Sequence, residues 1–217
     1  MNYQKELEKT LETLSSKPRL LLHACCGPCS SYVLETIASY FETTIIYYNP
    51  NIYPEAEYSR RLNELKTFLP RFTPAVENKI RTVELNYNSE EFYEAIKIKD
   101  DPQLAHEEEK GERCRRCYYL RLKKTYDFAV ENSFDYFCTT LSISPFKDSL
   151  KINTIGEELA AGNSSGPKWL YSDFKKKGGF QRSLELSREY DLYRQQYCGC
   201  VYSRQNADAH RNKNMVD

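Results

Sequence analysis

The sequence contains eight cysteines, and seven of them stand at spacings typical of metal ligands. They form the groups Cys25-Cys26-x-x-Cys29, Cys114-x-x-Cys117 and Cys198-x-Cys200. Two thiolates of a Cys-x-x-Cys turn can bind one metal, and two such pairs can make a tetrahedral zinc site. Seven thiols exceed the four that one zinc ion or one iron–sulfur cluster needs. The surplus therefore indicates a second metal or a direct role with the substrate.

The positions of the first group add a constraint. Cys25 and Cys26 are adjacent, and neighbouring side chains of a strand point to opposite faces. We therefore expect them to face two centres, or one of them to pack in the core, unless the strand ends before them. Cys29 lies in the first turn of a predicted helix, where backbone amides and the helix dipole favour thiolates. Cys138 stands alone in an apolar segment, and we interpret it as a core residue.

Composition narrows the class of protein. The 217 residues include 31 basic and 31 acidic side chains, and 40% of the residues are hydrophobic, which predicts one folded domain without net charge. No apolar stretch approaches the length of a transmembrane helix, and residues 1–17 lack the pattern of a secretory signal. We therefore expect a cytoplasmic protein with reduced thiols that bind metals. A disulfide framework and a purely structural zinc site remain as alternatives.

Apolar strands alternate with amphipathic helices along the chain. The predicted strands are 19–24, 43–48, 79–85 and 134–141, and the predicted helices are 2–14, 29–41, one from about 54, 88–96, 117–130 and one around 152–159. This alternation predicts an α/β fold, a Rossmann-like parallel sheet with helices on both faces. Ligands of such sheets bind at the carboxyl ends of the strands, where the first cysteines lie. We expect a single domain over 1–217, in which segment 163–217 folds back and brings Cys198 and Cys200 to the metal site.

Five segments in series, between Leu20 and Ser203, resemble the epoxyqueuosine reductase family QueH. They are Leu22-His-Ala-Cys-Cys-Gly-Pro-Cys29, Tyr48-Asn-Pro-Asn-Ile-Tyr-Pro54 with Glu57-Tyr58 and Arg60-Arg61, Glu112-Arg-Cys-Arg-Arg-Cys-Tyr118 with Leu120-Arg-Leu122, Thr139-Thr-Leu-Ser-Ile-Ser-Pro-Phe-Lys147, and Tyr193-Arg-Gln-Gln-Tyr-Cys-Gly-Cys200. A single one of these motifs would be a weak signal, whereas five in order are highly specific.

The resemblance implies a fold of the adenine nucleotide alpha-hydrolase-like (HUP) type, without implying use of ATP. It also implies cobalamin-independent reduction of epoxyqueuosine to queuosine in tRNA, the last step of queuosine biosynthesis. The implied cofactors are a [4Fe–4S] cluster and an adjacent mononuclear iron, supplied with electrons by an unidentified donor. Some members have Asp at the position of Cys29, which would place Cys29 on the second metal. The resemblance does not divide Cys25, Cys26, Cys114, Cys117, Cys198 and Cys200 between the two centres.

Removal of the epoxide oxygen as water requires two electrons and two protons. We predict that His23 or Asp148 supplies a proton, because His23 adjoins the first cysteines and Asp148 follows the Ser-Pro-Phe-Lys segment. For His23 the alternative is a buried ring whose hydrogen bonds are satisfied within the strand.

Substrate contacts are expected from aromatic, amide and basic side chains near the motifs. The predicted set is Tyr48, Asn51, Tyr53, Arg60, Arg61, Lys147, Lys175, Lys176 and Arg194. Two basic runs, 113–124 and 168–182, could contact tRNA phosphates, and Lys175 to Lys177 is the preferred candidate because it looks exposed. Solvated charges and core tyrosines are the alternative.

Two other functions remain in competition. A tRNA-thiolating enzyme of the PP-loop type shares the βα architecture, but it should carry Ser-Gly-Gly-x-Asp-Ser where this chain has Cys25-Cys-Gly-Pro-Cys-Ser30. A metal-stabilised or redox-sensing RNA-binding module would contain zinc and have no activity. Anaerobic purification distinguishes these classes, because iron and sulfide support the reductase and zinc alone supports the module.

Overall fold

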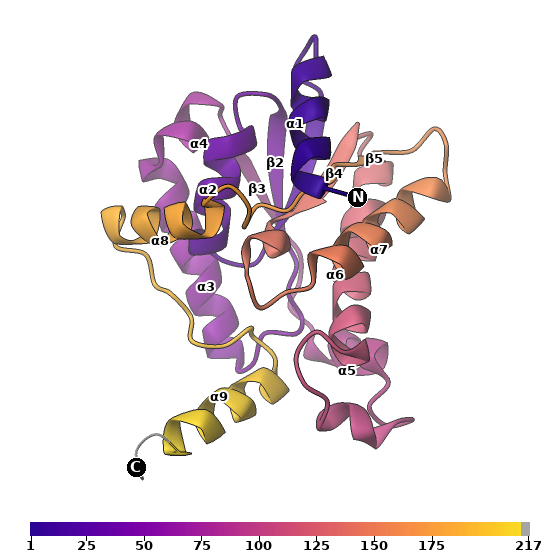
Figure 1. Cartoon of the computed structure of the whole chain (residues 1–217), viewed down its shortest axis with the longest axis vertical. Coiled ribbons are helices and arrows are strands. Elements are labelled where there is room, and N and C mark those ends of the chain that lie inside the picture. Colours follow the sequence, from indigo (N-terminus) through magenta and orange to yellow (C-terminus); the bar gives the residue numbers. More distant parts are fainter. Residues whose placement is uncertain (214–217) are drawn as a thin grey trace.

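The centre of the molecule is a five-stranded sheet in which every pair of neighbours is parallel. The computed structural model describes the backbone of residues 1–213 and the side chains of residues 1–209. The strand order is β3-β2-β1-β4-β5 (Figure 1), with β1 at Arg19–Ala24, β2 at Glu42–Tyr47, β3 at Arg81–Glu84, β4 at Tyr136–Thr139 and β5 at Lys168–Trp169. The predicted α/β class is confirmed.

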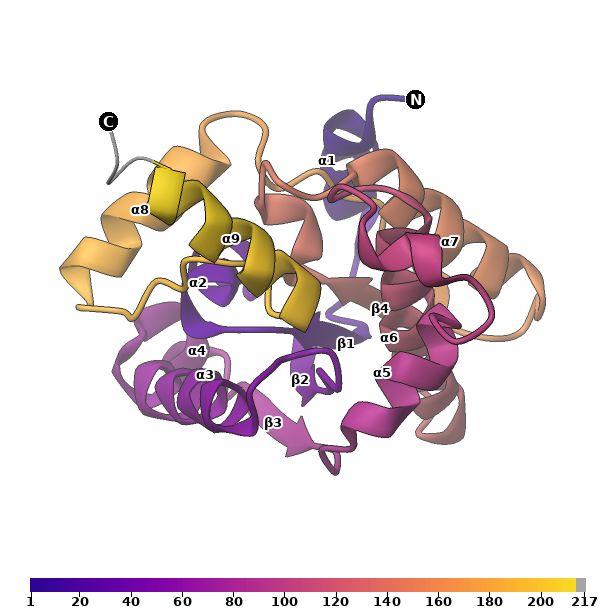
Figure 2. The same cartoon turned by 90° about the horizontal axis from the view of Figure 1, so that it is seen from below.

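Helices cover both faces of the sheet (Figure 2). One layer contains α2 (Gly27–Ile37), α3 (Glu55–Phe68), α4 (Thr73–Glu77) and α8 (Gly179–Glu189), and the other contains α5 (Ser89–Ile96), α6 (Glu112–Glu131) and α7 (Ser149–Ala161). The remaining helices are α1 (Tyr3–Thr13), α9 (Val201–Lys213) and the short 3₁₀ turns Leu69–Arg71, Pro102–Ala105 and Thr140–Ile143. None of the helices in residues 1–213 combines the length and apolarity needed to cross a membrane.

Strand β1 fixes the position of the site. Its residues Leu20 to Ala24 are buried, as expected for a central strand covered on both faces. The register pairs Ala24 with Tyr47 of β2 and His23 with Thr139 of β4. The segments that follow these strands therefore leave the sheet together, at the carboxyl ends of the strands, and they begin with Cys25, Tyr48 and Thr140.

Two helices begin earlier than the hydrophobic pattern predicts, and local hydrogen bonds explain both. The Cys26 side chain caps α2 by accepting a hydrogen bond from the Cys29 amide at 3.4 Å, so the helix begins at Gly27. The carboxylate of Glu107 accepts from the amides of Glu112 and Arg113, each at 2.7 Å. This contact caps α6 at its true start and places Cys114 within its first turn.

Three elements differ from expectation or lack a sequence signal. Strand β4 ends at Thr139, because the Thr139 hydroxyl caps a 3₁₀ turn over Thr140–Ile143. Strand β5 has two residues, which is too short for a periodicity, and α9 was not predicted. The single-domain prediction over 1–217 includes residues outside those described and stays a prediction.

Candidate metal centre and active site

Three thiols gather where β1 passes into α2. The sulfur atoms of Cys25, Cys26 and Cys29 all lie within 4.8 Å of one another, and those of Cys25 and Cys26 are 3.8 Å apart. The strand ends at Ala24, and this end frees the adjacent cysteines from alternating across the sheet. In the part of the chain whose side chains are described, this is the one trio of His, Cys, Asp or Glu with metal-like spacing. These three thiols could bind a metal.

The trio favours a thiolate at Cys25. Hydrogen bonds from Cys26 and Cys29 hold the pKa of Cys25 well below its usual range, and the nearby cations Lys147 and Arg121 act in the same direction. Burial and the neighbouring thiolate at Cys25 together raise the pKa of Cys26 to about 12. The same thiolate raises the pKa of Cys29. The first negative charge of the trio therefore resides on Cys25, and a cation would be needed to ionise all three.

The other four clustered cysteines lie on α6 and on the loop before α9. Burial raises the pKa of Cys114 to about 11, and the charges of Cys198 and Cys117 add to this shift. Burial also raises the pKa of Cys200 to about 12, again with contributions from Cys198 and Cys117. Cys117 and Cys200 share an apolar cluster with Phe92 and Ile96. The four thiols therefore lie close enough for the charge on one to raise the pKa of another, and they form a second group.

Three buried cations lie near both groups of cysteines. Arg61 is 1% exposed and Arg121 is 2% exposed, and Lys147 is also buried. Burial alone would lower the pKa of Lys147, but the charges of Cys198, Cys25 and Cys29 raise it more. Atom Nη2 of Arg121 is buried without a hydrogen-bond partner among the described residues. An anion between the two cysteine groups would compensate these charges.

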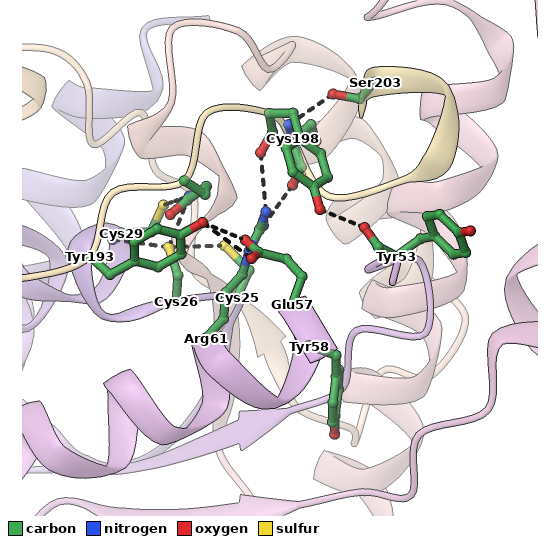
Figure 3. A network of polar contacts seen from close by, with 12 residues as sticks. Cys25, Cys26, Cys29, Tyr53, Glu57, Tyr58, Arg61, Tyr193, Cys198 and Ser203 are labelled. Atoms are coloured by element: carbon green, nitrogen blue, oxygen red, sulfur yellow. Dashed lines mark hydrogen bonds and ion pairs between the residues drawn. The ribbon is translucent and has the colours of Figure 1, made fainter. Parts of the chain in front are cut away.

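A network anchored on α3 holds the loop that carries Cys198 (Figure 3). Arg61 pairs with Glu57 at 2.7 Å and donates to the carbonyl oxygens of Cys198 at 3.0 Å and Tyr197 at 3.3 Å. The hydroxyl of Tyr193 donates to Glu57 at 3.2 Å. The C-terminal loop is thus bonded to residues some 136 positions earlier in the chain.

Gly199 fits this loop for two reasons. Its φ of +143° lies in a region that side chains rarely adopt. A Cβ atom there would also lie 3.2 Å from Nδ2 of Asn51 and 3.3 Å from Nη1 of Arg61. The Gly199 carbonyl accepts a hydrogen bond from the Tyr53 amide at 2.8 Å. The close approach of the two segments therefore depends on a residue without a side chain.

A cavity of about 690 Å³ opens between the two cysteine groups. Cys29 and Cys198 contribute to its wall, as do Lys147, Arg194 and Gln195. Phe146, 66% exposed, lies at the same cavity. We call this space the cysteine cavity. It is large enough for a nucleoside, and it presents cations and thiols on the same wall.

The structure distributes the predicted substrate residues over several places. Lys147 and Arg194 line the cysteine cavity, and Arg194 donates to the Ser187 hydroxyl at 3.0 Å. Asn51, Tyr53 and Arg61 lie under the C-terminal loop, where Tyr53 offers its backbone and Arg61 is buried. The guanidinium of Arg60 stacks on Tyr193, 3.4 Å from the ring centroid. The substrate roles of these residues stay predictions.

The remaining predicted residues lie outside the wall of the cysteine cavity. His23 is fully buried, with Nδ1 2.9 Å from the Thr139 hydroxyl and Nε2 3.1 Å from the Tyr48 carbonyl. Asp148 caps α7 by accepting from the amides of Leu150 and Lys151. These positions favour structural roles for both side chains, and their proton-donor role stays a prediction.

Tyr48 and part of the basic run 113–124 lie away from the cysteine cavity. The Tyr48 hydroxyl donates to the Glu91 carboxylate in the first turn of α5, and the Asn88 side chain caps this helix by accepting from the Glu90 amide. Tyr48 lines a groove of about 520 Å³ beside α6, which we call the α6 groove. Both basic runs contain cations that are paired within the protein. In the run 113–124, Arg115 and Arg116 pair with Glu112 and Lys123 pairs with Asp127. In the run 168–182, Lys175 pairs with Asp173, Lys177 with Glu8 at 2.5 Å, and Arg182 with Glu35 at 2.7 Å.

Two side chains at the site were not predicted from the sequence. Gln195 donates from Nε2 to the sulfur of Cys26 at 3.2 Å, across 169 positions of sequence. Arg121 belongs to the basic run 113–124, but both Arg121 and Arg113 are buried and cannot reach a phosphate. The helical spacing offered a signal for Arg121, because position 121 follows Cys114 and Cys117 at i+7 and i+4.

Known proteins resemble this chain over most of its length. The sequence model of the family described as "Epoxyqueuosine reductase QueH" matches residues 20–206. A protein of that name from Streptococcus pyogenes serotype M1 is 40% identical over 206 residues, 94% of this chain and 78% of the relative. Its namesake from Staphylococcus epidermidis is 37% identical over 94% of this chain and 84% of the relative.

A third protein of this name, from Thermotoga maritima, is 34% identical over 187 residues, which cover 85% of this chain and 89% of the relative. The family-model match contains all seven clustered cysteines and the whole wall of the cysteine cavity up to Asn206. The family resemblance predicted from the five motifs is confirmed. The chain belongs to the epoxyqueuosine reductase QueH family.

Proposed function

We propose that this protein reduces epoxyqueuosine in tRNA to queuosine, as the names of its relatives describe. The observation that carries the proposal is the cysteine cavity, because it joins a thiol trio, a second cysteine group and buried cations around a space of nucleoside size. Metal analysis of anaerobically purified protein tests it first. Iron with sulfide supports the reductase, and zinc alone supports the RNA-binding module instead.

The residues present fit a [4Fe–4S] cluster and a further iron. Thiolates are the preferred ligands of iron–sulfur clusters, and seven of them are available in two groups. An anionic cluster would also give the orphaned Nη2 of Arg121 a charged partner. The Cys25, Cys26 and Cys29 trio would hold one centre, and Cys114, Cys117, Cys198 and Cys200 would contribute to the other. When bound, these groups supply the two electrons that the deoxygenation consumes.

The protein's own side chains bind the nucleoside and supply a proton. The ammonium group of Lys147 lines the cavity between Cys29 and Cys198, where it can donate a hydrogen bond from Nζ to the epoxide oxygen. The same proton can pass to that oxygen as its first bond to carbon breaks, and solvent supplies the second proton as the other bond breaks and the oxygen leaves as water. Lys147 thereby joins His23 and Asp148 as a candidate proton donor, and among these three it is the one at the cavity wall.

Replacement of Lys147 by Met should separate these candidates. Proton transfer by a positioned side chain contributes about 100-fold or more, so we expect Lys147→Met to lower the single-turnover rate by about that factor. His23→Gln and Asp148→Asn should change the rate less than tenfold. Rapid quench followed by nucleoside analysis measures all three. Equal rates for Lys147→Met and the unmodified protein would exclude Lys147 from the proton step.

The tRNA backbone would lie along the α6 groove. Its wall includes the cations Arg115, Arg116, Lys123 and Lys124 and the ring of Tyr119, which is 42% exposed. The acids Glu91 and Asp127 also line it, so its cations exceed its acids by two. Lys124 lies 5.9 Å from the Tyr48 ring centroid. Phosphates beside exposed rings are the usual pattern of RNA contact.

A matched pair of charge reversals tests this surface. We expect Lys124→Glu to weaken tRNA binding by about tenfold and to reduce the salt slope by about one, since one phosphate contact is lost. Lys176→Glu, in the run 168–182, is the equivalent change in the segment preferred from the sequence. Filter binding at several salt concentrations measures both. A larger effect of Lys176→Glu would show that the run 168–182, and not the α6 groove, contacts the tRNA.

A further inference from the structure

Gln195 connects the metal-binding thiols to the substrate cavity. Its amide Nε2 lies 3.2 Å from the sulfur of Cys26 and 4.0 Å from that of Cys29. A thiolate or a metal-bound sulfur can only accept, so the nitrogen of the amide must face the sulfurs. This contact leaves the other end of the same amide, the oxygen Oε1, pointing away from them.

The oxygen of this amide is buried without a partner. Oε1 of Gln195 has less than 1 Å² of accessible surface and no hydrogen-bond partner among the described residues. A buried acceptor left unpaired is destabilising, so a ligand that donates to it is stabilised by the contact. Gln195 is part of the cysteine cavity wall, together with Cys29 and Lys147. We expect a hydroxyl of the nucleoside in the cavity to be the donor, and it reaches Oε1 when the side chains that cover this oxygen shift on binding.

We propose that Gln195 is a two-sided positioning residue, which donates from Nε2 to the Cys26 sulfur and accepts at Oε1 a hydroxyl of the bound nucleoside. The inference rests on the proposed function. Hydrogen bonds to ligand sulfurs stabilise the reduced, more negative form of an iron–sulfur centre and raise its reduction potential. Binding of the nucleoside fixes the amide and thereby holds the N–H group on the sulfur.

Two variants distinguish the role of the donor Nε2 from the role of the acceptor Oε1. Gln195→Leu removes both the donor and the acceptor. Gln195→Glu removes the donor and keeps acceptor oxygens at the same place. Gln181→Leu, on the exposed surface of α8, is the control for the chemical change. All are reconstituted with iron and sulfide, and iron content is measured before any comparison.

We expect both Gln195 variants to have a more negative midpoint potential in an anaerobic redox titration followed by electron paramagnetic resonance. Gln195→Leu should also raise the KM for the tRNA by about tenfold, the value of one hydrogen bond to a buried acceptor. Gln195→Glu should raise it less. The control should match the unmodified protein in both quantities.

The two proposals fail in different ways. An unchanged midpoint potential in Gln195→Leu overturns the role at the sulfur, and an unchanged KM overturns the role at the substrate, while the unmodified protein still produces queuosine. Absence of a redox-active centre or of queuosine from the unmodified protein overturns the proposed function, and the role of Gln195 falls with it. If Gln195→Leu does not retain iron, the midpoint potential of Gln195→Glu decides the role at the sulfur.

Discussion

We expect the replacement of Cys26 by Ser to abolish the reductase activity and the binding of one metal centre, while the apoprotein stays folded. The prediction follows from the two functions of Cys26, which belongs to the thiol trio and caps α2. Serine is among the best N-cap residues, so it preserves the cap, whereas its hard oxygen replaces a soft sulfur ligand. Iron analysis and turnover measure the loss of the metal.

Two further variants separate the effect on metal binding from the effect on stability. Cys26→Ala removes the cap as well, and we expect it to lower the free energy of unfolding of the apoprotein by about 1 kcal/mol more than Cys26→Ser does. Cys138→Ala is the control, because Cys138 is buried in β4, where its sulfur contacts the Leu170 carbonyl. It should cost about 1 kcal/mol of stability and leave iron content unchanged. Full iron content in Cys26→Ser would show that Cys26 is not a metal ligand.

Replacement of Arg61 by Met should have the largest effect on stability. The guanidinium is buried, pairs with Glu57 and bonds two carbonyl groups of the loop that carries Cys198. Removal of one partner of a buried ion pair costs about 3–5 kcal/mol, because the other charge stays buried and unpaired. We therefore expect a loss of that size in urea unfolding. The freed loop should also fail to bring Cys198 to the cavity, with a loss of iron.

The double variant Arg61→Met with Glu57→Gln separates the effect of the unpaired carboxylate from the effect of the lost hydrogen bonds to the loop. It removes the unpaired carboxylate, so it should recover a large part of the lost unfolding free energy. It does not restore the hydrogen bonds to Cys198 and Tyr197, so iron binding should stay impaired. Arg60→Met is the neighbouring control, because Arg60 stacks on the surface of Tyr193. A stability loss as large in Arg60→Met would contradict the assignment of the effect to the buried pair.

The fold and the first cysteine group followed from local patterns. The apolar run Leu20 to Ala24 and the helix after it determine where Cys25 and Cys29 lie, and both signals are contained within a few neighbouring residues. The ends of the elements depended on side-chain hydrogen bonds to backbone amides, such as the contact of Glu107 with the start of α6. A pattern of apolar residues carries no information on such caps.

The assignment of charged residues to roles could not be made from composition. Arg113 and Arg121 stand in a basic run of the sequence and Arg61 in the predicted substrate set, yet the fold buries all three, and Arg61 and Arg121 lie near the cysteines. Lys175 and Lys177 look free in the sequence and are paired with Asp173 and Glu8 in the fold. The contact of Gln195 with Cys26 spans 169 positions. Apart from the Lys175–Asp173 pair and the helical spacing of Arg121 with Cys114 and Cys117, these facts depend on which distant segments meet, and local patterns do not encode that.

We propose that the cysteine cavity deoxygenates epoxyqueuosine with electrons from iron held by these thiols. The most direct measurement is anaerobic incubation of the iron- and sulfide-reconstituted protein with epoxyqueuosine-containing tRNA and a strong reductant, followed by nucleoside analysis by mass spectrometry. We predict conversion to queuosine by the unmodified protein and none by Cys26→Ser. Persistence of epoxyqueuosine in the presence of the unmodified, iron-loaded protein would contradict this function, and equal conversion by Cys26→Ser would contradict the role of the thiol trio.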